Sequence, residues 1–150
     1  MDLAPDFDEF IGSLTARGVE FLIVGAYALA LHGAPRFTGD LDVFVRPTLD
    51  NASRLLDAVA AFGFPTTELR PADLLEPRRM LQMGVEPVQI HVITSISGVT
   101  WEEAWADRVV ARLGTHDVGI LGRSSFVRNK LAAGRPKDLA DVDAITPGTE

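Results

Sequence analysis

One stretch of this chain, residues 20–45 (EFLIVGAYALALHGAPRFTGDLDVFV), constrains the fold more than any other. The run Phe21–Val24 is short and wholly apolar, which predicts a strand buried on both faces. Gly25 ends this run, and good helix formers follow over Ala26–Leu31. The chain is therefore expected to pass directly from a buried strand into a short helix that ends near Gly33.

A second predicted strand follows in the same stretch. Leu41, Val43 and Val45 alternate with Asp40 and Asp42. Because side chains on a strand repeat every two residues, both carboxylates are expected on one face, a few ångströms apart. Two carboxylates this close repel each other unless a cation lies between them. Mg²⁺, with Mn²⁺ as an alternative, suits a site of one or two carboxylates completed by substrate phosphates.

The turn at Gly25 is a candidate phosphate-binding site. A strand that ends at glycine and turns into a helix directs free backbone N–H groups at whatever lies in front of it. Glycine also lets a ligand approach the backbone closely. A phosphate-binding turn followed by a carboxylate pair is the minimal set of groups for phosphoryl or nucleotidyl transfer. The same set would serve a metal-dependent phosphohydrolase, in which water replaces the acceptor hydroxyl.

The combined pattern resembles the DNA polymerase beta-type nucleotidyltransferase superfamily. The segments VGAYALALHGAPRFTGDLDVFV and GRPKDLADV are similar to its small bacterial branch related to AbiEii-type abortive-infection toxins. The resemblance spans roughly residues 18–143. It implies an α/β (α+β) nucleotidyltransferase fold with a mixed β-sheet and flanking helices. It also implies that the protein binds an NTP with Mg²⁺ through Asp40 and Asp42 and transfers a nucleotidyl group to a hydroxyl acceptor.

Two positions depart from the pattern that the resemblance implies. Ala26 stands where these proteins usually carry serine or a second glycine, so backbone N–H groups would bind phosphate without a hydroxyl. His91 stands where a later strand, Val88–Ile93, should supply the third catalytic carboxylate. Neutral imidazole can act as a base near pH 7, but it is a poor ligand for Mg²⁺. The alternative prediction is therefore a catalytically impaired binding module or a toxin–antitoxin component.

Three further residues of the same stretch are expected to bind the nucleotide. Tyr27 belongs to the turn that seats the triphosphate, and Arg36 and Thr38 lie on the loop before the carboxylates. The guanidinium of Arg36 has the fork of donors that matches a phosphate. The other interpretation of Arg36 is a surface ion pair with Asp6 or Asp8.

A basic cluster near the end of the chain is formed by Lys130, Arg135 and Lys137. A structural explanation is available, because Lys137 and Asp141 are spaced for an i,i+4 ion pair and a helix–helix turn separates Lys130 from Lys137. The resemblance instead implies that Lys130 and Lys137 hold phosphate or fix the corner between sheet and helix.

The remaining pattern predicts alternating helices and strands. Helices are expected over residues 5–17, 51–62, 101–105, 124–133 and from 136 onward, and hairpins over 79–93 and 109–121. Thr48 and Thr100 are expected N-caps, with Glu103 completing a capping box at Thr100. In the last helix, Leu139, Val142 and Ile145 are predicted to pack inward. The step from strand 40–45 into a helix predicts that part of the sheet is parallel.

Length and composition bound the remaining possibilities. The chain has 150 residues, with 47% hydrophobic and 23% charged, as expected for one globular domain over residues 1–150. It has no apolar run of 18 residues and no leader, which predicts a soluble cytoplasmic protein without a membrane partner. Without cysteine, thiolate metal sites are excluded.

The charge bears on the acceptor. A net charge of −7 argues against a broad nucleic-acid surface, although it allows a local basic patch. The acceptor is left open among RNA, a protein and a small molecule. With no separate acceptor-binding domain in view, we expect the acceptor to be small, or to be brought by a partner protein or by a second copy of this chain.

Overall fold

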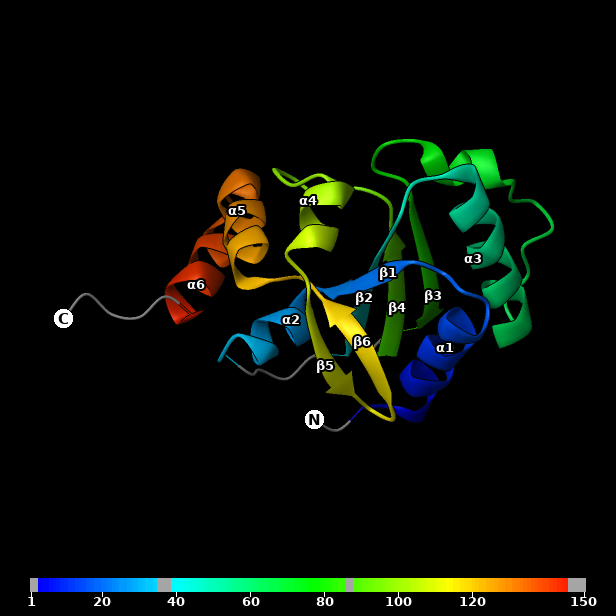
Figure 1. Ribbon diagram of the computed structural model, residues 1–150, viewed down its shortest axis with the longest axis horizontal. Helices are drawn as coiled ribbons and strands as arrows, with labels where there is room; N and C mark the ends of the chain where they lie inside the picture. The colour runs from blue at the N-terminus through cyan, green and yellow to red at the C-terminus, as the bar shows by residue number, and fades with distance from the viewer. Residues whose placement is uncertain (1–2, 35–38, 86–87, 146–150) are drawn as a thin grey trace.

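The computed structural model describes residues 3–34, 39–85 and 88–145, except for the side chain of Val85. Its strands form one six-stranded mixed sheet (Figure 1): β1 (Phe21–Val24), β2 (Asp40–Val45), β3 (Met80–Val85), β4 (Val88–Ile93), β5 (Val109–Leu113) and β6 (His116–Ile120). The helices are α1 (Pro5–Ala16), α2 (Ala26–Leu31), α3 (Leu49–Phe62), α4 (Trp101–Ala106), α5 (Arg123–Ala133) and α6 (Pro136–Ile145), with a 3₁₀ turn over Pro71–Leu75. The predicted α/β class is confirmed.

The order of the strands is β3-β4-β2-β1-β6-β5. β2 pairs antiparallel with β1 and parallel with β4, so the predicted crossover after β2 is confirmed. The two hairpins, β3–β4 and β5–β6, form the edges of the sheet. This order places the strand that carries Asp40 and Asp42 in the interior of the sheet.

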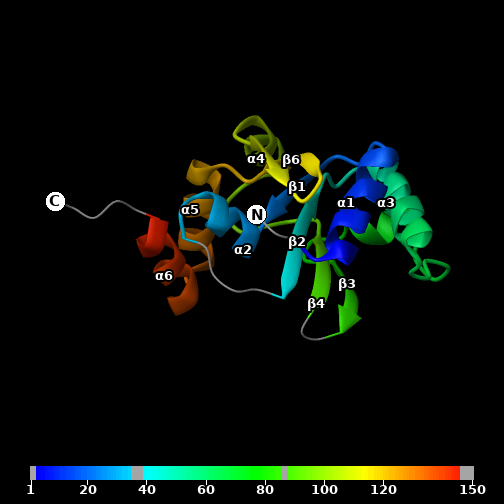
Figure 2. The ribbon, with the colours of Figure 1, turned by 90° about the horizontal axis from the view of Figure 1, so that it is seen from below.

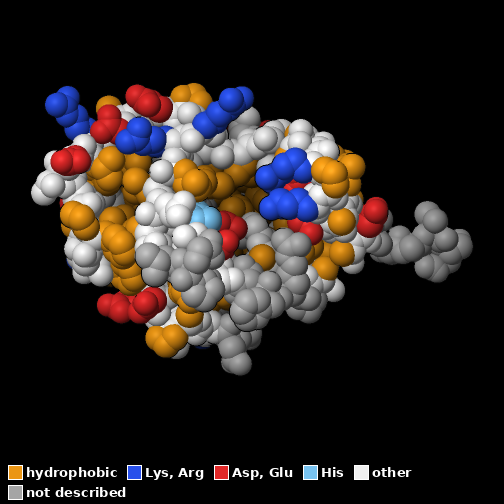
Figure 3. All heavy atoms as spheres, turned by 180° about the vertical axis from the view of Figure 1, so that it is seen from behind, with side chains coloured by type: hydrophobic (Ala, Val, Ile, Leu, Met, Phe, Trp, Pro, Cys, Tyr) orange, Lys and Arg blue, Asp and Glu red, His pale blue; other side chains and the backbone are white. Residues whose placement is uncertain are grey.

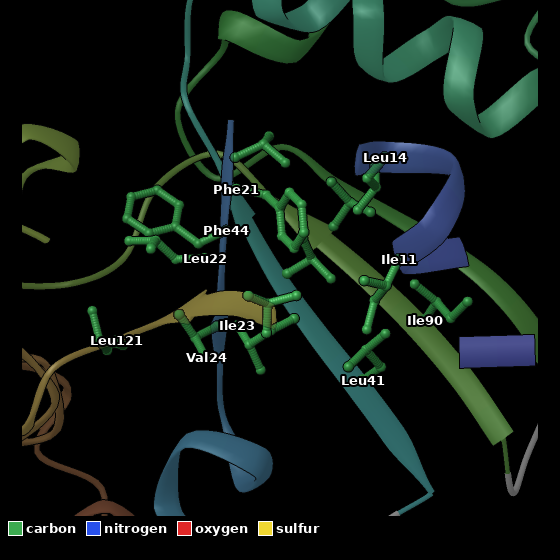
Figure 4. Close-up of a cluster of buried hydrophobic side chains, with 14 of the residues drawn as sticks. Ile11, Leu14, Phe21, Leu22, Ile23, Val24, Leu41, Phe44, Ile90 and Leu121 are labelled. Atoms are coloured by element: carbon green, nitrogen blue, oxygen red, sulfur yellow. The ribbon is translucent and has the colours of Figure 1, made fainter. Parts of the chain in front are cut away.

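One face of the sheet is covered by α1 and α3 (Figures 1 and 2). Ile11 and Leu14 of α1 are fully buried, and Ile11 lies beside Leu41 and Ile90 of the sheet (Figure 4). Leu41 and Val43 point to this face because they alternate with the two aspartates along β2. Burial of these apolar side chains fixes the register of β2, since a shift by one residue would bury the carboxylates instead.

The other face of the sheet is covered only in part. Phe44 follows Asp42 by two residues and packs edge-on against Trp101 of α4, with ring centroids 5.1 Å apart. The helices α5 and α6 lie together at the end of the molecule opposite α1 and α3 (Figures 1 and 2). The aspartates of β2 therefore have space in front of them rather than a packed helix.

The predicted helix starts are confirmed by their capping bonds. Asn51 N donates to Thr48 Oγ1 at 3.3 Å. At α4, Glu103 N donates to Thr100 Oγ1 at 3.1 Å, and Thr100 N donates to Glu103 Oε1 at 3.0 Å. Within the part of the chain that the structure describes, no helix combines the length and the apolarity that a membrane span needs.

The packing predicted for α6 is partly wrong. Leu139 is 44% exposed, whereas Asp138 and Asp141 are buried together with Ile145. The reason is electrostatic, because both aspartates turn toward Lys130 of α5. The inward face of α6 is thus acidic over its first two turns.

Candidate functional site

A hollow of about 360 Å³ opens on the partly covered face of the sheet. Figure 3 shows acidic side chains and a histidine beside the hollowed surface, with basic side chains across from them. We call it the carboxylate hollow. Its lining residues come from β1, β2, α2, the segment after β4, and the α5–α6 junction: Val24, Gly25, Ala26, Asp40, Asp42, Ile93, Ser95, Ile96, Ser97, Asn129, Lys130, Ala133, Arg135, Lys137 and Asp138.

The prediction that Asp40 and Asp42 share one face is confirmed. In the register of the sheet, Asp42 lies opposite Val24 of β1 and His91 of β4, and Asp40 lies opposite Gln89. Burial raises the pKa of Asp42 and the charge of Asp40 adds to this, whereas His91 and Lys130 act in the opposite direction. The two carboxylates thus form a partly desolvated pair, which favours a cation between them.

Gly25 lies directly against the carboxylate of Asp42. Its backbone angles, φ 70° and ψ −145°, belong to a region that is essentially restricted to glycine. A Cβ atom at this position would collide with Asp42 Oδ2. The strand-to-helix turn and the carboxylates therefore form one surface, and the side chain of any other residue would separate them.

His91 is held by contacts on both ring nitrogens. Its Nδ1 donates to Asp42 Oδ1 at 3.1 Å, and its Nε2 lies 3.1 Å from Gln89 Oε1. A carboxylate only accepts, so Nδ1 carries a proton. Nε2 either donates as part of an imidazolium or accepts from the side-chain amide of Gln89 in its other orientation. The role of Gln89 escaped sequence reasoning, although its spacing of two from His91 signalled a shared face.

Lys130 approaches the hollow from a buried ionic junction between α5 and α6. Its Nζ lies 3.3 Å from Asp138 Oδ1 and 3.3 Å from Asp141 Oδ2. Arg135 donates from Nε to Asp138 Oδ2 at 2.7 Å and from its backbone N to the same oxygen at 3.2 Å. These bonds, chiefly the one from the Arg135 side chain, lower the pKa of Asp138 to about 2. The junction holds Lys130 in place, close enough to Asp42 to oppose the rise that burial causes in the pKa of that carboxyl.

The other predicted nucleotide-binding residues are distributed unevenly. Ala26 and Lys137 line the carboxylate hollow. The side chain of Tyr27 is buried and packs edge-on against Phe7, with ring centroids 6.3 Å apart, so only its backbone is available to a phosphate. Arg36 and Thr38 lie outside the described residues.

Some polar residues of the hollow were not predicted. Ser95 and Ser97 lie on the segment after β4, and Asn129 Nδ2 donates to the Ser97 carbonyl oxygen at 3.0 Å, which links that segment to α5. In the sequence, Ser95 and Ser97 indicated only a polar turn, and Asn129 was only a helix residue next to Lys130. Their contribution to the hollow depends on the packing of α5 against the end of β4.

The donor set fits a divalent cation held jointly with a substrate. Asp40 and Asp42 offer hard carboxylate oxygens to the same hollow. Within residues 3–34, 39–85 and 88–145, no group of three or more His, Cys, Asp or Glu side chains is arranged to hold a metal ion. Mg²⁺ in this hollow would therefore take its remaining ligands from water and from phosphate oxygens.

Comparisons with known proteins show the fold. No protein-family model matches the sequence, and a search of curated proteins found no match either. The chain is similar in structure to TM1012 of Thermotoga maritima, a candidate nucleotidyltransferase, with a TM-score of 0.61 and 12% identity over 91% of this chain and 88% of that one. It is also similar to ANT(2")-Ia in complex with adenylyl-2"-tobramycin, with a TM-score of 0.57 and 11% identity over 93% of this chain and 84% of that one. The chain therefore shares its fold with these two proteins.

Proposed function

We propose that this protein is a metal-dependent nucleotidyltransferase of the DNA polymerase beta-type superfamily, which binds an NTP with Mg²⁺ and transfers a nucleotidyl group to a hydroxyl acceptor. The observation that carries the proposal is the contact between Gly25 and Asp42, which joins the turn and the carboxylates in one hollow. The volume of that hollow, about 360 Å³, lies within the usual range for small-molecule sites.

Each side of the carboxylate hollow has its own role in this proposal. The backbone of Gly25, Ala26 and Tyr27 faces the triphosphate, and Lys130 and Lys137 neutralise its charge from the α5–α6 side. Asp40 and Asp42 would hold the cation, which would polarise the α-phosphoryl group of the NTP and offset the charge that develops there. Fixed charges of this kind stabilise the transition state without reorganisation.

The reaction is an exchange at the α-phosphorus of the NTP. The acceptor oxygen forms a bond to that phosphorus, the bond from the phosphorus to pyrophosphate breaks, and the acceptor hydroxyl loses its proton. His91 is the candidate base, because it lies beside Asp42 on the next strand. To accept this proton, its Nε2 must first be released from Gln89.

The test of this function uses labelled NTPs with RNA, protein and small hydroxyl compounds as acceptors. We expect transfer that requires Mg²⁺ or Mn²⁺, and we expect Asp40→Asn and Asp42→Asn to reduce it by at least 100-fold. Asp50→Asn is the matched control, since Asp50 is exposed on α3 and pairs with Arg54. Transfer that persists unchanged in both aspartate variants would refute the mechanism.

A second candidate function is a nucleotide-binding module without turnover, for example a component of a toxin–antitoxin pair. The arrangement of His91 favours it, because the imidazole contacts Asp42 where a third carboxylate would otherwise stand and both of its nitrogens are engaged. Calorimetry separates the two functions. NTP binding without turnover in the wild type, together with turnover in His91→Asp, would establish the second one.

The relation to AbiEii-type toxins is a further part of the proposal. It rests on GDLDVFV and GRPKDLADV, which supply Asp42 on one side of the hollow and Lys130's partner Asp138 on the other. Induced expression in a bacterial host tests it. Growth arrest by the wild type but not by Asp42→Asn would support a toxin, whereas unaffected growth would argue against that role.

A further inference from the structure

A second hollow, of about 450 Å³, adjoins the carboxylate hollow. We call it the arginine hollow. Its own lining residues are Pro77, Arg78, Arg79 and Met80, at the start of β3. It shares with the carboxylate hollow the segment that leaves β4, namely Ile93, Ser95, Ile96 and Ser97. A molecule that passes over this segment would contact both hollows.

The charge of the arginine hollow is unusual for this chain. Its lining contains two arginines and no carboxylate, although the protein carries a net charge of −7. Of the eleven other Lys and Arg side chains that the structure describes, six have ion-pair partners, as Arg46 has Glu20 and Arg128 has Glu103. Within the described part of the chain, neither guanidinium of the arginine hollow has an ion-pair partner. The hollow thus has two guanidinium groups without a carboxylate in its own lining, and on its far side Arg79 also lines a neighbouring hollow whose lining carboxylate is Glu68.

The backbone of this region is fixed rather than loose. Arg78 has φ 66°, an uncommon conformation for a residue other than glycine. Its N–H donates to Ser95 Oγ at 3.2 Å, so Arg78 is tied to the segment shared by the two hollows. The neighbouring Arg79 N–H donates to the Glu76 carbonyl oxygen at 3.2 Å. Both arginines are therefore positioned by the same turn that borders the hollow.

The strand order places the two sites on opposite sides of the carboxylates. Gly25 follows β1, which neighbours β2 on one side, and the arginines precede β3, which lies beyond β4 on the other side. Lys130 and Lys137 belong to the carboxylate hollow and not to the arginine hollow. With the triphosphate on the side of β1, the side of β4 and β3 is left for the acceptor.

We propose that the arginine hollow binds the acceptor, and that this acceptor carries a phosphate group near its reacting hydroxyl. The inference rests on the proposed function, whose reaction is unchanged. Guanidinium groups bind phosphate through paired N–H donors, and two arginines without carboxylate partners favour an anion over a cation. A cationic acceptor such as tobramycin, with its protonated amines, would be repelled here. The phosphate belongs to a nucleic-acid end or to a phosphorylated small molecule.

Binding measurements on the full chain test this inference with three probes. The probes are a fluorescent six-nucleotide single-stranded RNA with a free 3′-hydroxyl, ribose 5-phosphate and tobramycin. The test variant combines Arg78→Gly, which suits the positive φ, with Arg79→Ala. The control is Arg70→Ala, because Arg70 is exposed, as Arg78 is, and has no ion-pair partner among the described residues, but lines neither hollow.

We expect one of the two phosphate probes to bind the wild type and Arg70→Ala equally, and the double variant at least tenfold more weakly. The probe that binds identifies the source of the phosphate. NTP affinity, measured separately by calorimetry, is expected to be the same in all three proteins.

Three results would overturn the inference. They are equal binding by the double variant, binding of neither phosphate probe to the wild type, and preferential binding of tobramycin. If the wild type fails to bind NTP, the proposed function is lost and the inference with it. If NTP binds but no probe depends on the arginines, the inference alone is wrong.

Discussion

The contact between Gly25 and Asp42 decides the chemistry at the scale of single residues. Gly25 adopts backbone angles that other residues avoid, and the space where its side chain would be is taken by the Asp42 carboxylate. Ala26, by contrast, begins a regular helix and also lines the hollow. Glycine is therefore required at position 25 for two reasons, the positive φ of the backbone and the Asp42 carboxylate that occupies the space of a Cβ atom.

Replacing Gly25 with alanine should impair both stability and binding. The new methyl group displaces the Asp42 carboxylate and imposes a disfavoured φ, so we expect a loss of about 2 kcal/mol in unfolding free energy. We also expect at least tenfold weaker NTP binding. Denaturant unfolding and calorimetry provide the two measurements.

Gly18→Ala is the control for that experiment. Gly18 has φ 68°, and a Cβ there would approach only the end of the Arg54 side chain, at 3.3 Å. It should lose stability without losing NTP affinity. Equal NTP affinity in Gly25→Ala and in the wild type would contradict the assignment of this turn to the phosphates.

At the scale of elements, the α5–α6 junction sets the position of Lys130. Asp138 is fully buried and binds both Lys130 and Arg135, while Asp141 provides a second carboxylate for Lys130. Removing one partner from a buried ion pair leaves the others uncompensated, which destabilises more than the pair itself stabilises. The junction therefore ties helix packing to the charge in the hollow.

Asp138→Asn should loosen this junction in a pH-dependent way. The pKa of Asp138 is lowered from 3.8 to about 2 in the folded protein, so its ionised form stabilises the fold by about 2 kcal/mol above pH 4. That advantage is lost as the pH falls through about 2, because the carboxyl is then protonated in both states. Urea unfolding of wild type and variant between pH 7 and pH 2.5 measures the difference.

Asp143→Asn serves as the control at the same scale. Asp143 lies on α6 and is exposed, so its replacement should change stability by less than 0.5 kcal/mol, roughly, at every pH. A difference between the wild type and Asp138→Asn that does not shrink below pH 4 would show that the carboxylate is not ionised in the junction.

At the scale of the whole molecule, the carboxylate hollow brings together residues of the sheet and of the α5–α6 pair. The sheet supplies Asp40, Asp42 and Gly25, and the α5–α6 pair supplies Lys130 and Lys137. These two groups of residues lie on different sides of the hollow, and both include charged side chains. A ligand that contacts both groups should therefore stabilise the entire domain.

NTP with Mg²⁺ should raise the melting temperature of the protein. A ligand at 100 times its Kd stabilises by about 2.7 kcal/mol, which for a domain of this size corresponds to roughly 5–10 °C. We expect the shift to fall below about 2 °C in excess chelator or in Asp42→Asn. Differential scanning calorimetry tests this, and a shift that survives both changes would place the nucleotide elsewhere.

Much of the fold could be predicted because its signals are local. The apolar run of β1, the alternation along β2 and the caps at Thr48 and Thr100 each specify their element within a few residues. The exposed Leu139 could not be predicted, because the inward face of α6 is selected by Lys130 on another helix. The roles proposed for Asp40, Asp42, His91 and the lysines stay predictions until the assays above are made.

The sequence by itself determined that two carboxylates share a strand face and follow a glycine turn, because periodicity and glycine's conformational freedom act within a few residues. Only the tertiary structure decided that Asp42 lies on Gly25, that His91 is held between Asp42 and Gln89, and that a second, arginine-lined hollow adjoins the first. These contacts join residues far apart in the chain, so strand order and helix packing, rather than local pattern, create them.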